Sequence, residues 1–186
     1  MTTLTRLPAV ETASLILREI ELRDAPSFCN YMMQESYQRH IAMRFRSEAE
    51  VKAFVTRSVA RQGDERRHVF HLAAEEKHAG EAIGDGFLIM KQPNTVEIGW
   101  GLHPAMWRMG LGTEIGRALL GLAVERLKAE NVWCKVMGGN AASARLARRI
   151  GLKHLTADAD HPAAPGATGK VEFYALSDSE YFDQGY

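Results

Sequence analysis

Residues 107–113 contain two glycines, at positions 110 and 112, between two segments of different periodicity. The preceding residues, 95–102, alternate as in a β-strand, and from Glu114 onward apolar residues recur every three or four positions, as in a helix. Backbone amides at a helix start have no helical acceptor, and glycine lets an anion approach them closely. The sequence therefore predicts an anion-binding turn held between a strand and a helix.

Two well-known glycine motifs do not fit this turn. A P-loop requires Gly-Lys followed by Ser or Thr, whereas Gly112 is followed by Thr113 and Glu114. A dinucleotide fingerprint requires a third glycine three positions after the second, and Gly116 comes one position late. The alternative is that Gly110 ends one turn and Gly112 begins another, and the spacing alone leaves this alternative open.

The composition is that of one compact domain over residues 1–186. The chain is 46% hydrophobic, and its 23 basic and 23 acidic residues balance, which gives no bias towards nucleic acid or membrane surfaces. Cys29 and Cys134 are expected to be reduced, apolar positions. No signal peptide and no run of ~20 apolar residues is seen, so we expect a cytoplasmic protein without a membrane partner.

The periodicity predicts a mixed α/β (α+β) fold. Strands are expected at 15–22, 68–75, 82–91, 95–102, 132–137, 153–157 and 171–176. Helices are expected after Asp24, from Ser47, from Glu114, and from Asn140 to Ile150, with Asp24, Ser47 and Asn140 as amino-terminal caps. These elements predict a mostly antiparallel sheet of about six to seven strands with helices on both faces, in which 95–102 and 132–137 run parallel. Segments 36–46 and 158–169 are expected to line an acceptor cavity as loops.

Three sets of residues occur in an order and spacing that resemble a known family. They are Leu15-Ile16-Leu17-Arg18 with Asp24-Ala25; Ile98-Gly99-Trp100 with Pro104 and residues 107–114; and Asn140, Ser143 and Gly151-Leu152. Together they resemble the GCN5-related N-acetyltransferase (GNAT) family, and within it the RimJ/RimL-like branch. The resemblance covers nearly the whole chain.

The resemblance implies acetyl-CoA as the acyl donor. Its diphosphate would bind amides of the 107–113 turn, and its pantetheine arm would lie between strands 95–102 and 132–137. The implied cofactor-binding residues are Gly99, Leu102, Trp107, Arg108, Met109, Gly110, Leu111, Gly112, Thr113, Asn140, Ser143 and Arg145. For the Trp107 ring we favour packing beneath the turn over direct ligand contact. No metal is expected, because the seven histidines show no ligand spacing.

The catalytic candidates are Glu97 and Ser143. An amine must lose a proton before or during attack, and the resemblance implies that Glu97 acts as the base through a water molecule. The alternative is a strand glutamate paired with a cation. Many relatives carry a tyrosine acid where this chain has Ala147, so Ser143 would stabilise the departing thiolate instead. Its alternative role is bonding to its own helix. Tyr174 and Tyr181 remain further candidates for the acid.

The expected function is N-acetyl transfer from acetyl-CoA to a primary amine, by direct attack in a ternary complex. The acceptor is a small molecule or a protein amino terminus, and the balanced net charge favours the small molecule. The alternative is an acyl-CoA-binding sensor or an inactive protein of the same fold. The family resemblance also suggests a homodimer. The length of the acyl group and the identity of the amine stay open.

Overall fold

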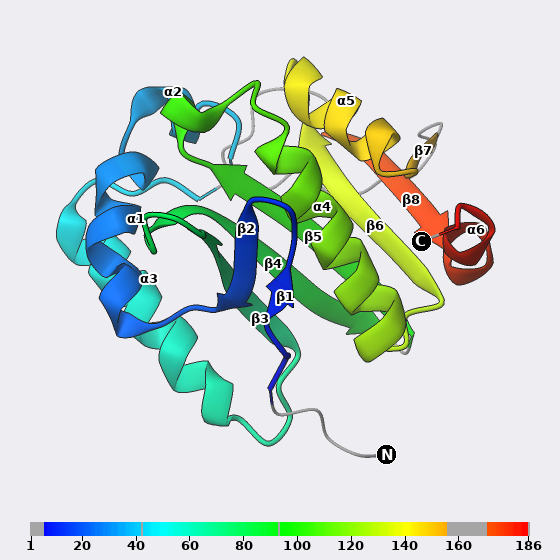
Figure 1. Ribbon diagram of the computed structural model, residues 1–186, viewed down its shortest axis with the longest axis horizontal. Coiled ribbons are helices and arrows are strands. Elements are labelled where there is room, and N and C mark those ends of the chain that lie inside the picture. Colours follow the sequence, from blue (N-terminus) through cyan, green and yellow to red (C-terminus); the bar gives the residue numbers. More distant parts are fainter. Residues whose placement is uncertain (1–5, 42, 93, 156–170, 186) are drawn as a thin grey trace.

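The computed structural model describes residues 6–41, 43–92, 94–155 and 171–185, and its centre is one eight-stranded sheet (Figure 1). The strand order is β1-β2-β3-β4-β5-β6-β8-β7. The strands are β1 Val10–Glu11, β2 Leu15–Glu19, β3 Val69–Glu76, β4 Ala82–Gln92, β5 Thr95–Leu102, β6 Asn131–Met137, β7 Lys153–Leu155 and β8 Val171–Ser177.

Neighbouring strands are antiparallel except for β5 and β6, which are parallel. This confirms the predicted mixed sheet and its parallel step. The additional strand is β1, whose two residues are too few to show an alternating pattern in the sequence. The end of the strand predicted at 153–157, and the segment 158–169, lie outside the described residues.

The helices are α1 Ala25–Met32, α2 Glu35–Gln38, α3 Glu48–Ala60, α4 Leu111–Gly121, α5 Ala141–Arg149 and α6 Asp178–Asp183. A π-helical segment, Leu122–Arg126, continues α4. Two short helices were absent from the prediction, α2 and α6, and α2 falls in the segment expected to be a loop. None of the helices in the described ranges has the length and apolar character needed to cross a bilayer.

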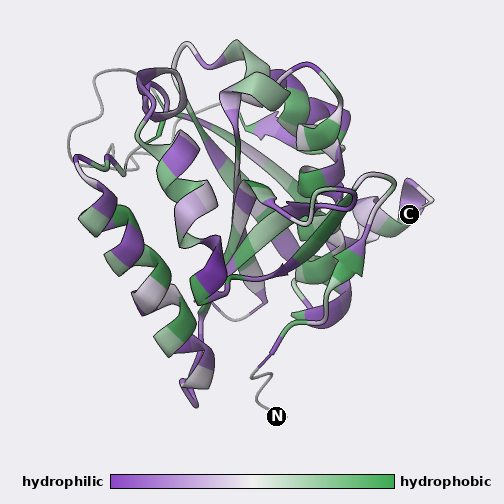
Figure 2. Cartoon of the chain, turned by 60° about the vertical axis from the view of Figure 1, so that its left-hand side comes forward, coloured by the Kyte–Doolittle hydropathy of each residue, from purple (hydrophilic) through white to green (hydrophobic). Residues whose placement is uncertain are grey.

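Each face of the sheet has its own apolar core. In Figure 1, α4 lies in front of the strands, with α5 beside it, and α1 and α3 lie towards the left. The α4 side buries Leu88, Ile98, Ile115 and Leu119, whereas the α1 and α3 side buries Phe28, Tyr31, Phe54 and Val55. Hydrophilic and hydrophobic patches alternate along the helices of this second side (Figure 2), as expected for helices with one buried face.

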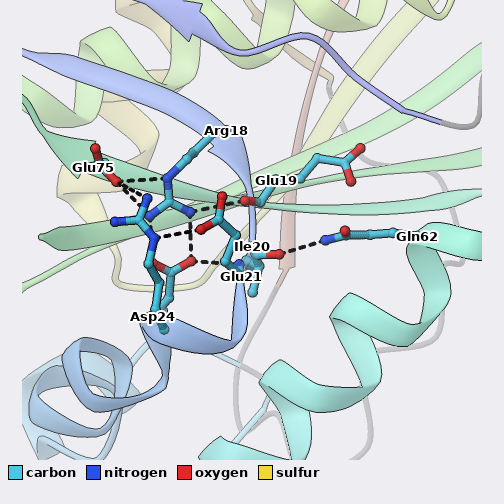
Figure 3. Close-up of polar contacts among 8 residues, drawn as sticks. Arg18, Glu19, Ile20, Glu21, Asp24, Gln62 and Glu75 are labelled. Carbon is cyan, nitrogen blue, oxygen red and sulfur yellow. Dashed lines mark hydrogen bonds and ion pairs between the residues drawn. The ribbon is translucent and has the colours of Figure 1, made fainter. Parts of the chain in front are cut away.

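Arg18 joins the first long strand to the first helix. Its guanidinium makes two hydrogen bonds to Asp24 and one to Glu75 of β3 (Figure 3). Asp24 also accepts a hydrogen bond from the Glu21 amide, at 2.8 Å. The prediction that the Asp24 side chain caps α1 is therefore wrong, because its carboxylate is occupied by Arg18 and makes no hydrogen bond to an α1 amide.

The other predicted caps are confirmed. The Ser47 hydroxyl accepts a hydrogen bond from the Glu50 amide at 3.3 Å, and the Asn140 carboxamide oxygen accepts one from the Ser143 amide at 3.1 Å. Gly151 ends α5 with a left-handed φ of 92°, a conformation that glycine adopts without steric cost. Asn140 and Gly151 thus fix both ends of α5.

Candidate active site

The first component of the site is the place where β5 and β6 separate. Residues 95–97 pair with residues 131–133, but β5 continues to Leu102 and β6 to Met137 without further pairing between them. On its other side β5 stays paired with β4 as far as Leu102. The edge of residues 98–102 that faces β6 therefore has no strand partner in the described chain, and its amides and carbonyls can bind an extended ligand.

The second component is the turn before α4. Arg108 and Gly110 have left-handed φ values of 68° and 83°, and Gly110 is the N-cap of α4. The flanking amides are satisfied: that of Trp107 donates to the Pro104 carbonyl at 3.3 Å and that of Thr113 donates to Gly110 at 2.9 Å. Within the described residues the five amides of 108–112 donate to no acceptor. Such a row of free amides at a helix start is a typical anion site.

The α4 helix starts three residues before the predicted Glu114, because Gly110 supplies the N-cap. Glu114 has a structural role: it accepts hydrogen bonds from the Thr12 hydroxyl and from the Ser14 amide and hydroxyl. Burial opposes ionisation of Glu114, but these hydrogen bonds together lower its pKa below the usual value. The first turn of α4 is thereby fastened to the β1–β2 hairpin.

Trp107 lies differently from the prediction. Its side chain is 45% exposed, and its indole Nε1 donates a hydrogen bond to the Leu102 carbonyl at 2.9 Å. The prediction of a ring packed beneath the turn is therefore wrong; the ring stays at the surface and ties the turn to the end of β5. Met109, also on the turn, is 65% exposed.

Glycines in α4 allow α5 to approach closely. A Cβ atom at Gly112 or at Gly116 would stand 2.9 Å from the Leu146 side chain. Ser143 lies three residues before Leu146, so both side chains are on the same face of α5 and Ser143 is directed towards α4. The Ser143 amide donates a hydrogen bond to Asn140, but the Ser143 hydroxyl makes no hydrogen bond in the described chain. The alternative role, a hydroxyl bonded to its own helix, is therefore not observed.

The two further candidates for the acid, Tyr174 and Tyr181, form hydrogen bonds to other residues. Tyr174 is buried; its hydroxyl donates to Glu172 at 2.6 Å and accepts from Arg148 at 3.0 Å. Burial, followed by the contact with Glu172, raises the pKa of Tyr174 to about 12, which makes it a poor proton donor. Tyr181 donates to Glu125, beyond the carboxy-terminal end of α4.

Arg145 directly precedes Leu146, so its side chain leaves α5 about 100° away from that of Leu146. It lines a surface hollow of about 250 Å³ together with Gly139, Asn140, Ala141, Ala144, Arg148 and Glu172. The structure therefore brings Arg145 next to Asn140 at the start of α5, but gives its guanidinium no contact with the 107–113 turn.

Glu97 occupies the last position at which β5 and β6 pair. Its side chain is 7% exposed, and its carboxylate forms ion pairs with Lys91 at 3.1 Å and Lys135 at 3.4 Å. The Lys91 ammonium lies next to Oε2, but this ion pair does not have hydrogen-bond geometry, so Oε2 accepts no hydrogen bond in the described chain. The alternative reading of Glu97 as a cation-paired glutamate is thus observed in part, although the carboxylate is buried instead of exposed.

A cluster that the sequence analysis missed lies on the same face of the sheet. The hydroxyls of Tyr31 and Tyr37 both donate to Oδ1 of Asp85, at 3.1 and 2.6 Å. Asp85 stands between two glycines in β4, and a charged residue inside a central strand is the signal that could have revealed it. In the described ranges, no three His, Cys, Asp or Glu side chains form a group that could hold a metal ion.

Comparison with known proteins indicates the family of this chain. The family model described as an acetyltransferase (GNAT) domain matches residues 14–153. The chain is 26% identical over 148 residues to the uncharacterized N-acetyltransferase YoaA of Bacillus subtilis (strain 168), with 78% of this chain and 83% of YoaA covered.

Two solved structures have the same fold. One is a GNAT-family acetyltransferase from Bacillus anthracis, with a TM-score of 0.79, 16% identity, and coverage of 92% of this chain and 99% of that one. The other is the ribosomal L7/L12 α-N-protein acetyltransferase RimL in complex with coenzyme A, with a TM-score of 0.77, 16% identity, and coverage of 91% and 98%.

Proposed function

Because this chain belongs to the GNAT acetyltransferase family, we propose that it transfers an acetyl group from acetyl-CoA to a primary amine within a ternary complex. The observation that carries the proposal is the row of amides at 108–112, which have no acceptor in the described chain, next to the unpaired edge of β5. A donor with a diphosphate and an arm containing amide groups is complementary to both features.

The diphosphate would bind at the amides of 108–112. The amino-terminal end of α4 adds the positive end of its dipole, and the exposed Arg108 adds a positive charge. The amide groups of the pantetheine arm would pair with residues 98–102, in the manner of a strand added to a sheet edge. The thioester would then lie where β5 and β6 separate, between Glu97 and Ser143.

At that point the amine nitrogen attacks the thioester carbonyl carbon. The new C–N bond forms and the C–S bond breaks, so the nitrogen must give up a proton and the sulfur leaves as a thiolate. We assign proton removal to Glu97, through a water molecule, and hydrogen bonding of the thiolate to Ser143, whose hydroxyl has no other partner in the described chain. The corresponding thiol has a pKa of about 8.5, so solvent can then protonate the thiolate.

The test combines binding and turnover. The purified chain is titrated with CoA in a calorimeter and then incubated with acetyl-CoA and a panel of primary amines, including a peptide with a free amino terminus, while free thiol and acetylated product are measured. We expect CoA binding and thiol release with at least one amine. Absence of binding to CoA would overturn the proposal, and tight binding without thiol release from any amine would favour an acyl-CoA sensor.

A further inference from the structure

Strands β4 and β5 carry two carboxylates, Asp85 and Glu97, and their environments differ. Two lysine ammonium groups contact Glu97, whereas no cation of the described chain contacts Asp85. Both tyrosine hydroxyls donate to Oδ1 of Asp85, and its Oδ2 accepts no hydrogen bond from the described residues. Asp85 is thus the carboxylate on this face of the two strands that lacks a countercharge.

Glycines in β5 bring Asp85 to the separated part of the sheet. Asp85 is the register partner of Gly101, and Phe87 is the partner of Gly99. A Cβ atom on Gly101 would stand 2.4 Å from Oδ1 of Asp85 and 2.3 Å from the Tyr37 hydroxyl. The carboxylate and the hydroxyl therefore lie over the Gly101 backbone, in the section of β5 that has no pairing with β6.

The two tyrosines hold the carboxylate in place without neutralising it. Tyr31 and Tyr37 are buried, and each has one hydroxyl proton, which it donates to Asp85. Burial raises the pKa of Asp85, and the tyrosine hydrogen bonds offset this only in part. A partly buried carboxylate without a cation is unfavourable, and a cation bound from outside would favour its ionised form.

We propose that Asp85, oriented by Tyr31 and Tyr37, binds a protonated amino group of the acceptor. This inference rests on the proposed function, which places the reacting nitrogen near Glu97. That nitrogen is neutral when it attacks, so the group bound by Asp85 is a second, positively charged one. Gly101 is four residues from Glu97 along β5, or about 13 Å at 3.3 Å per residue, and the Phe87 ring lies over Gly99 between them, so the bound molecule must pass over this ring. The acceptor class is therefore a flexible diamine or polyamine.

The test compares unbranched diamines of increasing length with monoamines of the same length. For the wild-type protein we expect kcat/KM to be roughly tenfold to a hundredfold higher for a diamine of suitable length, from a charge-assisted hydrogen bond. Asp85→Asn keeps the shape and the tyrosine hydrogen bonds but removes the charge. We expect it to raise KM for the diamine, to abolish the preference over the monoamine, and to retain CoA affinity. Asp64→Asn, the same change at an exposed site, is the control.

The outcomes separate this inference from the proposed function. Equal use of diamines and monoamines by the wild type, or a diamine preference that survives in Asp85→Asn, overturns the inference while acetyl transfer stands. If no amine is acetylated, acetyl transfer fails, and calorimetry of the same diamines with the CoA-loaded protein decides the role of Asp85. Binding that is lost in Asp85→Asn supports the cation site, and absent or equal binding overturns it.

Discussion

The guanidinium of Arg18 binds the carboxylate of Asp24 through two hydrogen bonds, at 2.8 and 2.7 Å, across the turn between β2 and α1. Its Nε atom donates to Glu75 of β3 at 2.8 Å. Bidentate pairs of this kind fix geometry as well as charge. These contacts connect the Leu-x-Leu-Arg segment of the sheet to the Asp-Ala segment at the start of the first helix. The two segments that resemble the family motif therefore fix the position of this helix on the sheet.

We predict that Arg18→Ala lowers the free energy of unfolding by about 3 to 5 kcal/mol, because it leaves the carboxylate of Asp24, which is 3% exposed, without its cation. Urea unfolding followed by circular dichroism measures the change. The control is Arg23→Ala, whose side chain is 56% exposed and whose loss should destabilise the fold much less, because exposed ion pairs contribute little. Equal effects of the two substitutions would show that the Arg18 pair does not stabilise the fold.

Gly110→Ala should weaken CoA binding. Gly110 has a φ of 83°, and a side chain there is strained by about 1 to 2 kcal/mol. This strain distorts the row of amides, and an energy of this size corresponds to a loss of about tenfold in CoA affinity. Gly80→Ala is a matched control, because Gly80 also has a left-handed φ, of 68°, and open space around its Cβ position. Both variants should lose similar stability, and only Gly110→Ala should raise the CoA dissociation constant in calorimetry.

Local patterns were enough to predict most of the sheet and the ends of α5. Alternation indicated β2 to β5, and the cap at Asn140 and the stop at Gly151 lie where the sequence places them. These features depend on residues within a few positions of one another. The two-residue β1 and the four-residue α2 were missed because elements this short span about one period and cannot repeat a pattern.

Long-range contacts decided the remaining features. Glu114 was predicted only as the start of a helix, but it binds Thr12 and Ser14, about a hundred positions earlier in the chain. Asp85 meets Tyr31 and Tyr37 only after β4 has packed beneath α1. The sequence therefore indicated the donor side of the candidate site, whose motif is contiguous, and gave little information on the acceptor side, which is assembled from separate elements.

Glu97→Gln should lower turnover at neutral pH by about a hundredfold, if Glu97 is the base. The loss should shrink as pH rises towards the pKa of the acceptor amine, because more of the amine is then deprotonated without help. Steady-state rates between pH 6.5 and 10 measure this. The substitution also leaves Lys91 and Lys135 without their partner, so CoA affinity and unfolding are compared with those of the wild type. A constant loss at every pH would assign Glu97 to the lysine pairs alone.

Ser143→Ala should reduce kcat while the CoA dissociation constant stays close to that of the wild type. The hydroxyl has no partner in the described chain, and the cap of α5 depends on the Ser143 amide, which alanine retains. Asn140→Ala is the contrasting variant, since it removes the cap and should cost about 1 kcal/mol of stability. Turnover that is unaffected by Ser143→Ala would exclude the hydroxyl from thiolate stabilisation.

His71 should make the fold sensitive to mild acid. Its Nδ1 atom lies 2.9 Å from the Ser58 hydroxyl, and burial, followed by the charges of Arg61 and Arg67, lowers its pKa from 6.5 to about 4. The unfolded chain thus binds a proton below pH 6.5 that the folded chain does not bind until about pH 4. Stability from this residue is complete above pH 6.5 and falls as the pH is lowered through that window, by about 3 kcal/mol in total.

Urea unfolding of the wild type and of His71→Gln at pH 7, 5.5 and 4.5 tests this dependence. Glutamine can still hydrogen-bond to Ser58 but does not titrate, so the variant should lose less stability than the wild type between pH 7 and pH 4.5. His68→Gln, at an exposed site, should follow the wild type throughout. Parallel pH profiles for the wild type and His71→Gln would mean that His71 can be protonated in the folded chain without cost, and its burial between α3 and β3 would then have no part in the acid sensitivity.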